Sequence, residues 1–271
     1  MRLCLYLLTA ALATGARAEI RGVLKSVEID SMLSCASADA PIHERPHYSI
    51  WLVVRSGKAG PAENHASADE ILFIRRGNAV VSLGSAAKTG GTKRLEAAAG
   101  DIIKIPAGAP HRLDPGRSRF EALSLRISAA SESVKPREGI RPPARQMAER
   151  LTKSEIDATF ANFTSNQPIH SAPNFTMNYV IYTGHSGPWE AHAGCVDIYF
   201  LNIGSATAQI GGVIRNAKED VPGEPRGDSV AGASTYTVGP GDLVVIPRNT
   251  AHHMDPGAGK LGYVLVKVWV D

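Results

Sequence analysis

Two sets of histidine and carboxylate residues recur in this sequence at the same spacing. Each set has a histidine, a carboxylate five positions later, and a second histidine that stands five positions after a proline. The members are His65, Glu70 and His111 in the first set and His192, Asp197 and His252 in the second. If strands bring the members of a set together inside one β enclosure, two imidazoles and a carboxylate converge, and such ligands suit a divalent transition metal.

A second carboxylate stands two positions before the first histidine of each set. Side chains alternate faces along a strand, so Glu63 points to the same side as His65, and Glu190 to the same side as His192. These glutamates are candidate metal ligands. Alternatively, each is a general base beside an open coordination position, or a partner that holds a histidine tautomer.

Both sets lie in a long internal repeat. Residues 24–84 align without a gap with residues 151–211 at an offset of 127, and after a 14-residue insertion the alignment resumes at residue 241. A period this long indicates a duplicated domain, because solenoid units run about 20 to 50 residues. The loop that contains the insertion, residues 216–234, is rich in Gly, Pro and charge. Loops of this kind are functional lids or are disordered, and the sequence leaves both open.

Each repeat contains short runs of β-branched and aromatic residues that are separated by Gly, Ser and Pro, which is typical of strands. The runs are 49–55, 71–74, 80–83, 101–105 and 120–127 in the first repeat and 177–182, 196–201 and 206–210 in the second. We therefore predict an all-β fold, with a β-sandwich or small barrel in each half. Helical pattern is confined to the start of each repeat, as over 145–151 and 154–160.

The spacing of these residues resembles the two motifs of the cupin superfamily, G-x5-H-x-H-x3-4-E-x6-G and G-x5-P-x-G-x2-H-x3-N, and the duplication is similar to that of the two-domain bicupins. The matching positions are His65, Glu70, Gly77, Gly100, Pro106, Gly108 and His111, then His192, Asp197, Gly204, Gly241, Pro247 and His252. The resemblance implies two tandem cupin-like β-barrels of the jelly-roll type, each with a short helix at its start.

The sequence departs from the cupin pattern at positions that would bind a metal. Glu63 and Glu190 replace the first histidine of the motif, Asp197 replaces its glutamate, and Asn249 replaces a glycine. A set of two histidines and two carboxylates is harder than the three-histidine set of the family. We therefore expect Fe or Mn, rather than Cu, Zn or Ni, in one or two sites.

The ends of the chain predict an exported protein. Residues 1–18 carry Arg2, an apolar run and small residues before Glu19, as a secretory signal peptide does. We expect an N-terminal barrel over 19–130, a linker with a short helix over 131–150 and a C-terminal barrel over 151–271. The predicted location is periplasmic or extracellular, and no later segment is long and apolar enough to span a bilayer.

The mature chain has a nearly neutral charge balance. Without its first 18 residues it has 27 basic and 26 acidic residues, so neither nucleic acid nor an anionic membrane is an expected partner. Export also permits a disulfide, so Cys35 and Cys195 are either bridged or two buried small apolar residues. The resemblance to cupins implies a monomer or a homodimer.

The leading hypothesis is an exported, metal-dependent bicupin enzyme that acts on a small oxygenated molecule by O2 insertion, decarboxylation or isomerisation. In it, Glu190 and Asp197 are catalytic groups that handle protons. Candidate substrate residues gather around the second set: Trp189, Tyr182, His185, Tyr199 and Arg248. The alternative is a non-catalytic bicupin that binds a sugar, a small acid or a metal, and the resemblance also includes storage proteins. The fold alone does not decide between them.

Overall fold

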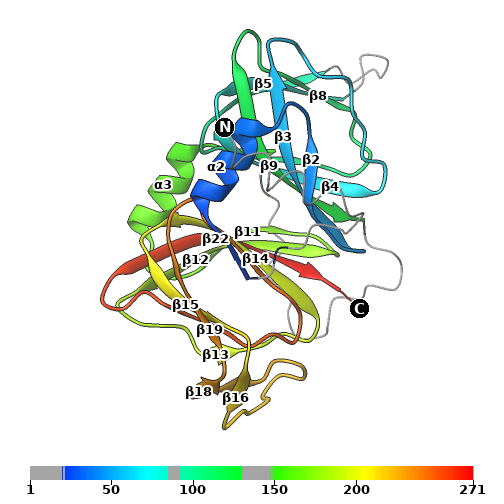
Figure 1. Ribbon diagram of the computed structural model, residues 1–271. Helices are drawn as coiled ribbons and strands as arrows, with labels where there is room; N and C mark the ends of the chain where they lie inside the picture. Colours follow the sequence, from blue (N-terminus) through cyan, green and yellow to red (C-terminus); the bar gives the residue numbers. More distant parts are fainter. Residues whose placement is uncertain (1–19, 21, 85–91, 130–146, 148, 271) are drawn as a thin grey trace. The chain divides into compact units, whose positions relative to one another are not determined.

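The computed structural model describes residues 20, 22–84, 92–129, 147 and 149–270 (Figure 1). They form two compact units. The N-terminal unit contains Ile29–Ala129 and Met147–Ala158, and the C-terminal unit contains Ile20–Glu28 and Thr159–Asp271. The predicted signal peptide and most of the predicted linker lie outside the described residues. In the part of the chain that the structure describes, no helix has the length and apolarity to cross a membrane.

The N-terminal unit is built from two antiparallel sheets. Its larger sheet has the order β10-β7-β4-β9-β3-β2 and its smaller sheet the order β6-β5-β8. The strands are β2 (Ala40–Glu44), β3 (Tyr48–Ser56), β4 (Ala68–Arg76), β5 (Asn78–Leu83), β6 (Lys93–Ala98), β7 (Ile102–Ile105), β8 (His111–Asp114), β9 (Arg119–Ser128) and β10 (Arg150–Leu151). Both sheets contribute to one buried cluster, which includes Leu72, Val81 and Phe120. The core therefore lies between the sheets.

The C-terminal unit repeats this plan with a six-stranded sheet, β1-β20-β14-β22-β12-β11, and a five-stranded sheet, β17-β13-β21-β15-β19. A separate pair, β16-β18, extends from it (Figure 1). The bounds are β1 (Gly22–Leu24), β11 (Gln167–Ser171), β12 (Phe175–Thr183), β13 (Trp189–Glu190), β14 (Cys195–Ile203), β15 (Ala206–Ile210), β16 (Val213–Arg215), β17 (Arg226–Gly227), β18 (Ser229–Ala231), β19 (Ser234–Val238), β20 (Leu243–Ile246), β21 (His252–Asp255) and β22 (Lys260–Trp269). Tyr199, Ala208 and Met254 belong to its buried core.

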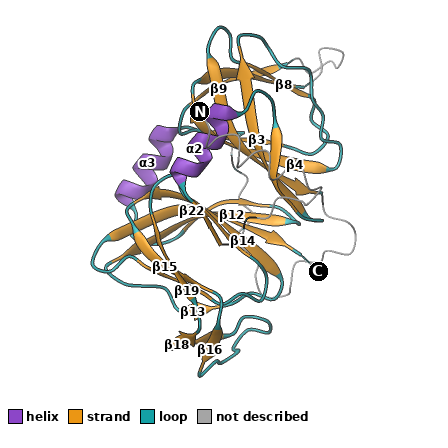
Figure 2. Cartoon of the chain, in the orientation of Figure 1, coloured by secondary structure: helices purple, strands orange, loops and turns teal. Residues whose placement is uncertain are grey.

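The predicted all-β class is confirmed, and each predicted strand run falls on a strand of the structure (Figure 2). The helix predicted over 145–151 is wrong at its described end, because Arg150–Leu151 form β10, which pairs with Ile102–Ile103 of β7. At the matching place before the first repeat, β1 pairs with β20. Sheet hydrogen bonds at an edge thus outweigh the helix propensity of this short segment.

Two helices, α2 (Ser26–Cys35) and α3 (Lys153–Asn162), precede the strands of the two repeats. The prediction of a helix over 154–160 is confirmed by α3. A capping box begins it: the Glu155 carboxylate accepts the Thr152 N–H at 2.8 Å, and the Glu155 N–H donates to the Thr152 hydroxyl at 3.2 Å. Each helix then buries one apolar stripe, which in α3 contains Ile156 and Phe160.

The glycine that ends each first motif sits where no side chain fits. Gly77 has φ +77° and Gly204 has φ +72°, which is the left-handed region. A Cβ at Gly77 would collide with the backbone carbonyl of Arg119, and one at Gly204 with that of Lys260. These glycines allow β4 and β14 to turn into the next strand against a close neighbour.

The cysteines do not form a bridge between the repeats. Cys195 is buried and carries a free thiol, so it is not bonded to Cys35. Its thiol instead lies 3.5 Å from an oxygen of Asp197. The interpretation of Cys195 as a small buried residue is therefore the correct one.

Candidate metal centres

The N-terminal centre consists of Glu63, His65, Glu70 and His111, which three different stretches of backbone bring together. Glu63 and His111 form an antiparallel bridge, with N–H···O distances of 2.8 and 2.9 Å in the two directions. Glu70 lies on β4. His65 lies in the loop before that strand, where its carbonyl accepts the N–H of Gly108 at 2.9 Å. The glycine of the second motif thus fixes the position of the first histidine.

The imidazole rings of this centre face a common point. The ring centroids of His65 and His111 are 5.2 Å apart, and their Nε2 atoms lie 3.3 and 3.2 Å from Oε2 of Glu70. Ligand atoms of Glu63, His65 and His111 lie within 4.8 Å of one another. Nδ1 of His111 donates to the carbonyl of Ala109 at 3.2 Å, which leaves Nε2 to face the centre.

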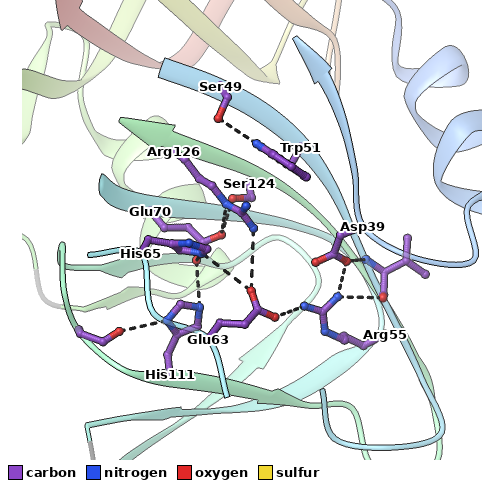
Figure 3. A network of polar contacts seen from close by, with 12 residues as sticks. Asp39, Ser49, Trp51, Arg55, Glu63, His65, Glu70, His111, Ser124 and Arg126 are labelled. Carbon is purple, nitrogen blue, oxygen red and sulfur yellow. Dashed lines mark hydrogen bonds and ion pairs between the residues drawn. The ribbon is translucent and has the colours of Figure 1, made fainter. Parts of the chain in front are cut away.

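Two arginines balance the carboxylates of the N-terminal centre (Figure 3). Arg126 lies across from Glu70 on β9, with its Nε 3.2 Å from Oε1 of that residue and its guanidinium stacked 4.5 Å above the ring of Trp51. Arg55 forms ion pairs with Asp39 and Glu63. The pKa of Arg55 is raised, because its carboxylate partners outweigh the effect of burial.

Within this network Glu70 is held as a carboxylate. Burial by itself raises its pKa, but the two histidines, Arg126 and the hydroxyl of Ser124 lower the pKa well below its usual value. The contact between Glu70 and His111 also changes the pKa of the histidine. Burial lowers the pKa of its ring, yet the Glu70 carboxylate outweighs burial and raises it. Each of these two residues therefore stabilises the charged form of the other.

The N-terminal centre fits a divalent metal. The Nε2 atoms of His65 and His111 are buried and have no aligned hydrogen bond among the described residues, although a carboxylate lies beside them. Buried polar atoms without partners are rare. Two such lone-pair donors that face a carboxylate oxygen form a set that Fe(II) or Mn(II) can bind.

The C-terminal centre has the equivalent members Glu190, His192, Asp197 and His252. Glu190 on β13 pairs with His252 on β21, as Glu63 does with His111. The ring centroids of His192 and His252 are again 5.2 Å apart, and their Nε2 atoms lie 3.5 and 3.8 Å from Oδ2 of Asp197. Nδ1 of His252 donates to the carbonyl of Thr250 at 3.0 Å. The structure thus brings each predicted ligand set together in its own unit.

A lysine distinguishes the C-terminal centre from the N-terminal one. Nζ of Lys267 on β22 lies 2.9 Å from Nε2 of His192 and 3.3 Å from Oδ2 of Asp197. Burial by itself raises the pKa of Asp197, but Lys267 and the two histidines outweigh it and lower the pKa. The pKa of Lys267 is raised in turn, because Asp197 outweighs burial. The C-terminal centre therefore fits a metal less well. Nε2 of His252 has no aligned hydrogen-bond partner among the described residues, but Nε2 of His192 is already hydrogen-bonded to Lys267.

The insertion contributes to this second centre. Oε2 of Glu224 lies 2.9 Å from Nδ1 of His192, away from the direction of an aligned hydrogen bond, and Nε of Arg226 lies 3.3 Å from Oε2 of Glu190. The segment is also ordered into β17 and β18. Of the two interpretations that the sequence left open, the structure favours a covering loop.

The candidate substrate residues of the second repeat lie at different depths. Tyr199 is buried and donates its hydroxyl to Oδ2 of Asp197 at 3.2 Å. Trp189 is buried too, and its ring stacks on His253 with centroids 4.7 Å apart. Tyr182 is half-buried, whereas His185 and Arg248 are exposed. Their role in binding substrate stays a prediction.

Sequence reasoning missed Arg126, Lys267 and Glu224. The two cations occupy equivalent positions of the repeat, which is a signal that the alignment contains. Their relevance depends on strand register, which places Arg126 opposite Glu70 and Lys267 opposite Asp197. The insertion has no counterpart in the first repeat, so no comparison within the sequence points to Glu224.

Solved structures with a similar fold include cupin-domain proteins. A cupin 2 conserved barrel domain protein from Leptotrichia buccalis matches with a TM-score of 0.57 and 14% identity, over 93% of this chain and 100% of that chain. Salicylate 1,2-dioxygenase from Pseudaminobacter salicylatoxidans matches with a TM-score of 0.63 and 8% identity, over 97% and 93%. The formate complex of oxalate decarboxylase from Lactobacillus farciminis matches with a TM-score of 0.51 and 15% identity, over 93% of this chain and 83% of that chain. No family model and no curated protein matches the sequence. At these identities the likeness extends to the fold and not to an activity.

Proposed function

We propose that this chain, which has the all-β cupin fold, is a metal-dependent enzyme that acts on a small carboxylic, hydroxy or keto acid. The observation that carries the proposal is the N-terminal centre, where Nε2 atoms of His65 and His111 meet a carboxylate oxygen of Glu70 without aligned partners of their own. Two of the compared cupin structures are an oxalate decarboxylase and a salicylate 1,2-dioxygenase, so the fold supports this kind of chemistry.

The residues of the N-terminal centre would have different roles in such an enzyme. His65, His111 and Glu70 would hold the metal, which would supply Lewis-acid polarisation of a substrate oxygen or activation of O2. Arg126 and Arg55 place positive charge beside the ligands and offset the charge of Glu70 and Glu63. Glu63 lies 3.8 Å from Nε2 of His65 through Oε2, at the edge of the set, where a carboxylate can accept a substrate proton.

In the C-terminal centre the two predicted catalytic carboxylates differ. Asp197 is held ionised by Lys267, so it is poorly suited to carry a proton at neutral pH. Glu190 lies at the edge of the set, as Glu63 does, and keeps the proposed proton role in this centre.

A test of the proposal measures metal content and turnover together. Protein loaded with Fe(II) or Mn(II) is incubated with a panel of hydroxy, keto and dicarboxylic acids, and O2 consumption and CO2 release are recorded. We expect turnover of at least one acid, and loss of both metal and turnover in the His65→Ala/His111→Ala variant. Turnover that persists in this metal-free variant would contradict the proposal.

The second candidate function is a non-catalytic bicupin that binds a small acid or a metal. It is favoured by the complete charge pairing of Arg55 with Asp39 and Glu63, which leaves less freedom for proton transfer. Stoichiometric binding of an acid to the metal-loaded protein without any turnover would favour this function.

We also propose that the protein is exported, as a monomer or homodimer, on the strength of the signal-like pattern of residues 1–18. Expression of the full chain in a Gram-negative host should give a periplasmic protein whose mass corresponds to a start at Glu19. Light scattering of that product gives its oligomeric state. A cytoplasmic product with an intact N-terminus would contradict export.

A further inference from the structure

The cation opposite the metal-binding carboxylate takes a different position in the two centres. In the N-terminal centre Arg126 is stacked on the ring of Trp51, and its Nε contacts Oε1 of Glu70. The other oxygen of Glu70, Oε2, is the one that faces the two imidazoles. Arg126 therefore pairs with the oxygen of Glu70 that is turned away from the imidazoles, and its other close carboxylate is the edge residue Glu63, 3.9 Å from its Nη2. Oε2 of Glu70 and the two Nε2 atoms stay available to a metal.

Lys267 has no such platform. The repeat places Asn178 at the position equivalent to Trp51. The ammonium instead reaches Oδ2 of Asp197, which is the oxygen that faces both imidazoles, and Nε2 of His192. Lys267 thus contacts the atoms that a metal in this centre would use.

An ammonium and a divalent ion exclude each other at this point. The hydrogen bond from Lys267 engages the Nε2 lone pair of His192, and a metal needs the same lone pair. A cation that remained about 3 Å from a divalent ion in a buried site would also repel it strongly. Because an ammonium can only donate, its hydrogen bond to Nε2 requires the tautomer of His192 with the proton on Nδ1, and this tautomer presents the same lone pair to a metal.

We infer that the C-terminal centre carries its own internal cation, Lys267, and that the protein binds one divalent metal per chain, at the N-terminal centre only. The inference rests on the proposed function for the identity of the N-terminal site. The role of Lys267 follows from contacts inside the C-terminal unit alone, so the two can fail separately.

The test counts metal ions in the purified full chain. Each variant is stripped with chelator, reloaded with Mn(II), passed through a desalting column and analysed by elemental mass spectrometry and Mn(II) electron paramagnetic resonance. We expect one Mn per chain in the wild type, one in His192→Ala/His252→Ala, none in His65→Ala/His111→Ala, and two in Lys267→Ala. Arg126→Ala is the matched control, and it should still bind one.

The outcomes separate the two proposals. Two ions in the wild type, or one ion that survives in His65→Ala/His111→Ala, would overturn the inference while metal dependence itself could stand. No ion in the wild type, but one in Lys267→Ala, would reject the N-terminal metal site and support the blocking role of the lysine. A count of one in folded Lys267→Ala would reject that role. If Lys267→Ala does not fold, the histidine variants still decide where the metal binds.

Discussion

Replacement of Lys267 by methionine should destabilise the C-terminal unit far more than the same change at Arg126 destabilises the N-terminal unit. The side chain of Asp197 is 2% exposed, and without the lysine its non-histidine partners among the described residues are the Tyr199 hydroxyl at 3.2 Å and the Cys195 thiol at 3.5 Å. Removal of one member of a buried ion pair costs about 3–5 kcal/mol, because it leaves an uncompensated buried charge. These neutral donors place the expected loss near the lower limit, at about 3 kcal/mol.

The matched change, Arg126→Met, leaves Glu70 with better partners. Its carboxylate keeps the Ser124 hydroxyl, and its two imidazoles lie at 3.3 and 3.2 Å, closer than the 3.5 and 3.8 Å of those beside Asp197. We expect a loss of about 1–2 kcal/mol, which corresponds to one charged hydrogen bond and one cation–π contact. Urea unfolding in the presence of chelator, with hydrogen exchange of β4 and β14 amides to report each unit separately, measures both values.

The pH dependence of this loss provides a second readout. In the wild type the pKa of Asp197 is lowered, so its contribution to stability is present above the unfolded pKa of about 3.9 and is lost as the pH falls through the folded pKa. Replacement of Lys267 removes the largest influence that lowers the pKa of Asp197 and leaves burial in place, so we expect this pKa to rise and the penalty to be largest at pH 7 and to shrink towards pH 5. An equal penalty at both pH values, or a Lys267→Met loss no larger than that of Arg126→Met, would refute the reasoning.

Three further predictions concern the metal and the turn. The pKa of His111 is raised above 6.5, so a metal must displace a proton there at lower pH. The affinity for Mn(II) should therefore fall about tenfold per pH unit below that pKa. An affinity that stays constant between pH 5.5 and 8 would contradict this. Gly204→Ala should lower the free energy of unfolding in urea by about 2–4 kcal/mol, because the added Cβ collides with the backbone of β22. Gly184, at φ +64°, has open space around it, so Gly184→Ala should lower that free energy by about 1 kcal/mol. Equal losses in the two variants would count against the collision. Trp51→Asn should release Arg126 toward the imidazoles and lower Mn(II) affinity at least about tenfold, which is about 1.4 kcal/mol; unchanged binding in an isothermal titration would exclude that role of the ring.

The strands were predictable because their signals are local. Alternation and turn residues mark runs such as 49–55 and 120–127, and these become β3 and β9. The segment 145–151 shows where local signals fail. Its residues favour a helix by propensity, but the backbone of Arg150–Leu151 gains hydrogen bonds to β7, which lies far away in the sequence.

The ligand sets were predictable for a different reason. Spacing within a motif is conserved between the two repeats of this chain, so His65 and His192 each predict the other's surroundings. Contacts that cross from strand to strand have no such spacing. Lys267 meets Asp197 only because β22 pairs with β14 in one register, and a shift by one residue would turn the ammonium to the other face.

Two centres with the same ligand spacing can therefore differ in what they bind. The ligands themselves change little between the repeats: both have two imidazoles, a glutamate at the edge and a buried carboxylate. The difference lies in two positions outside the motifs, where Trp51 and Arg126 are replaced by Asn178 and Lys267. A planar guanidinium on an aromatic ring contacts the carboxylate from the side away from the imidazoles, whereas a flexible ammonium without that ring extends to an imidazole as well. Exchange of these two positions between the units, with every ligand of each set left as it is, should accordingly exchange their metal occupancy.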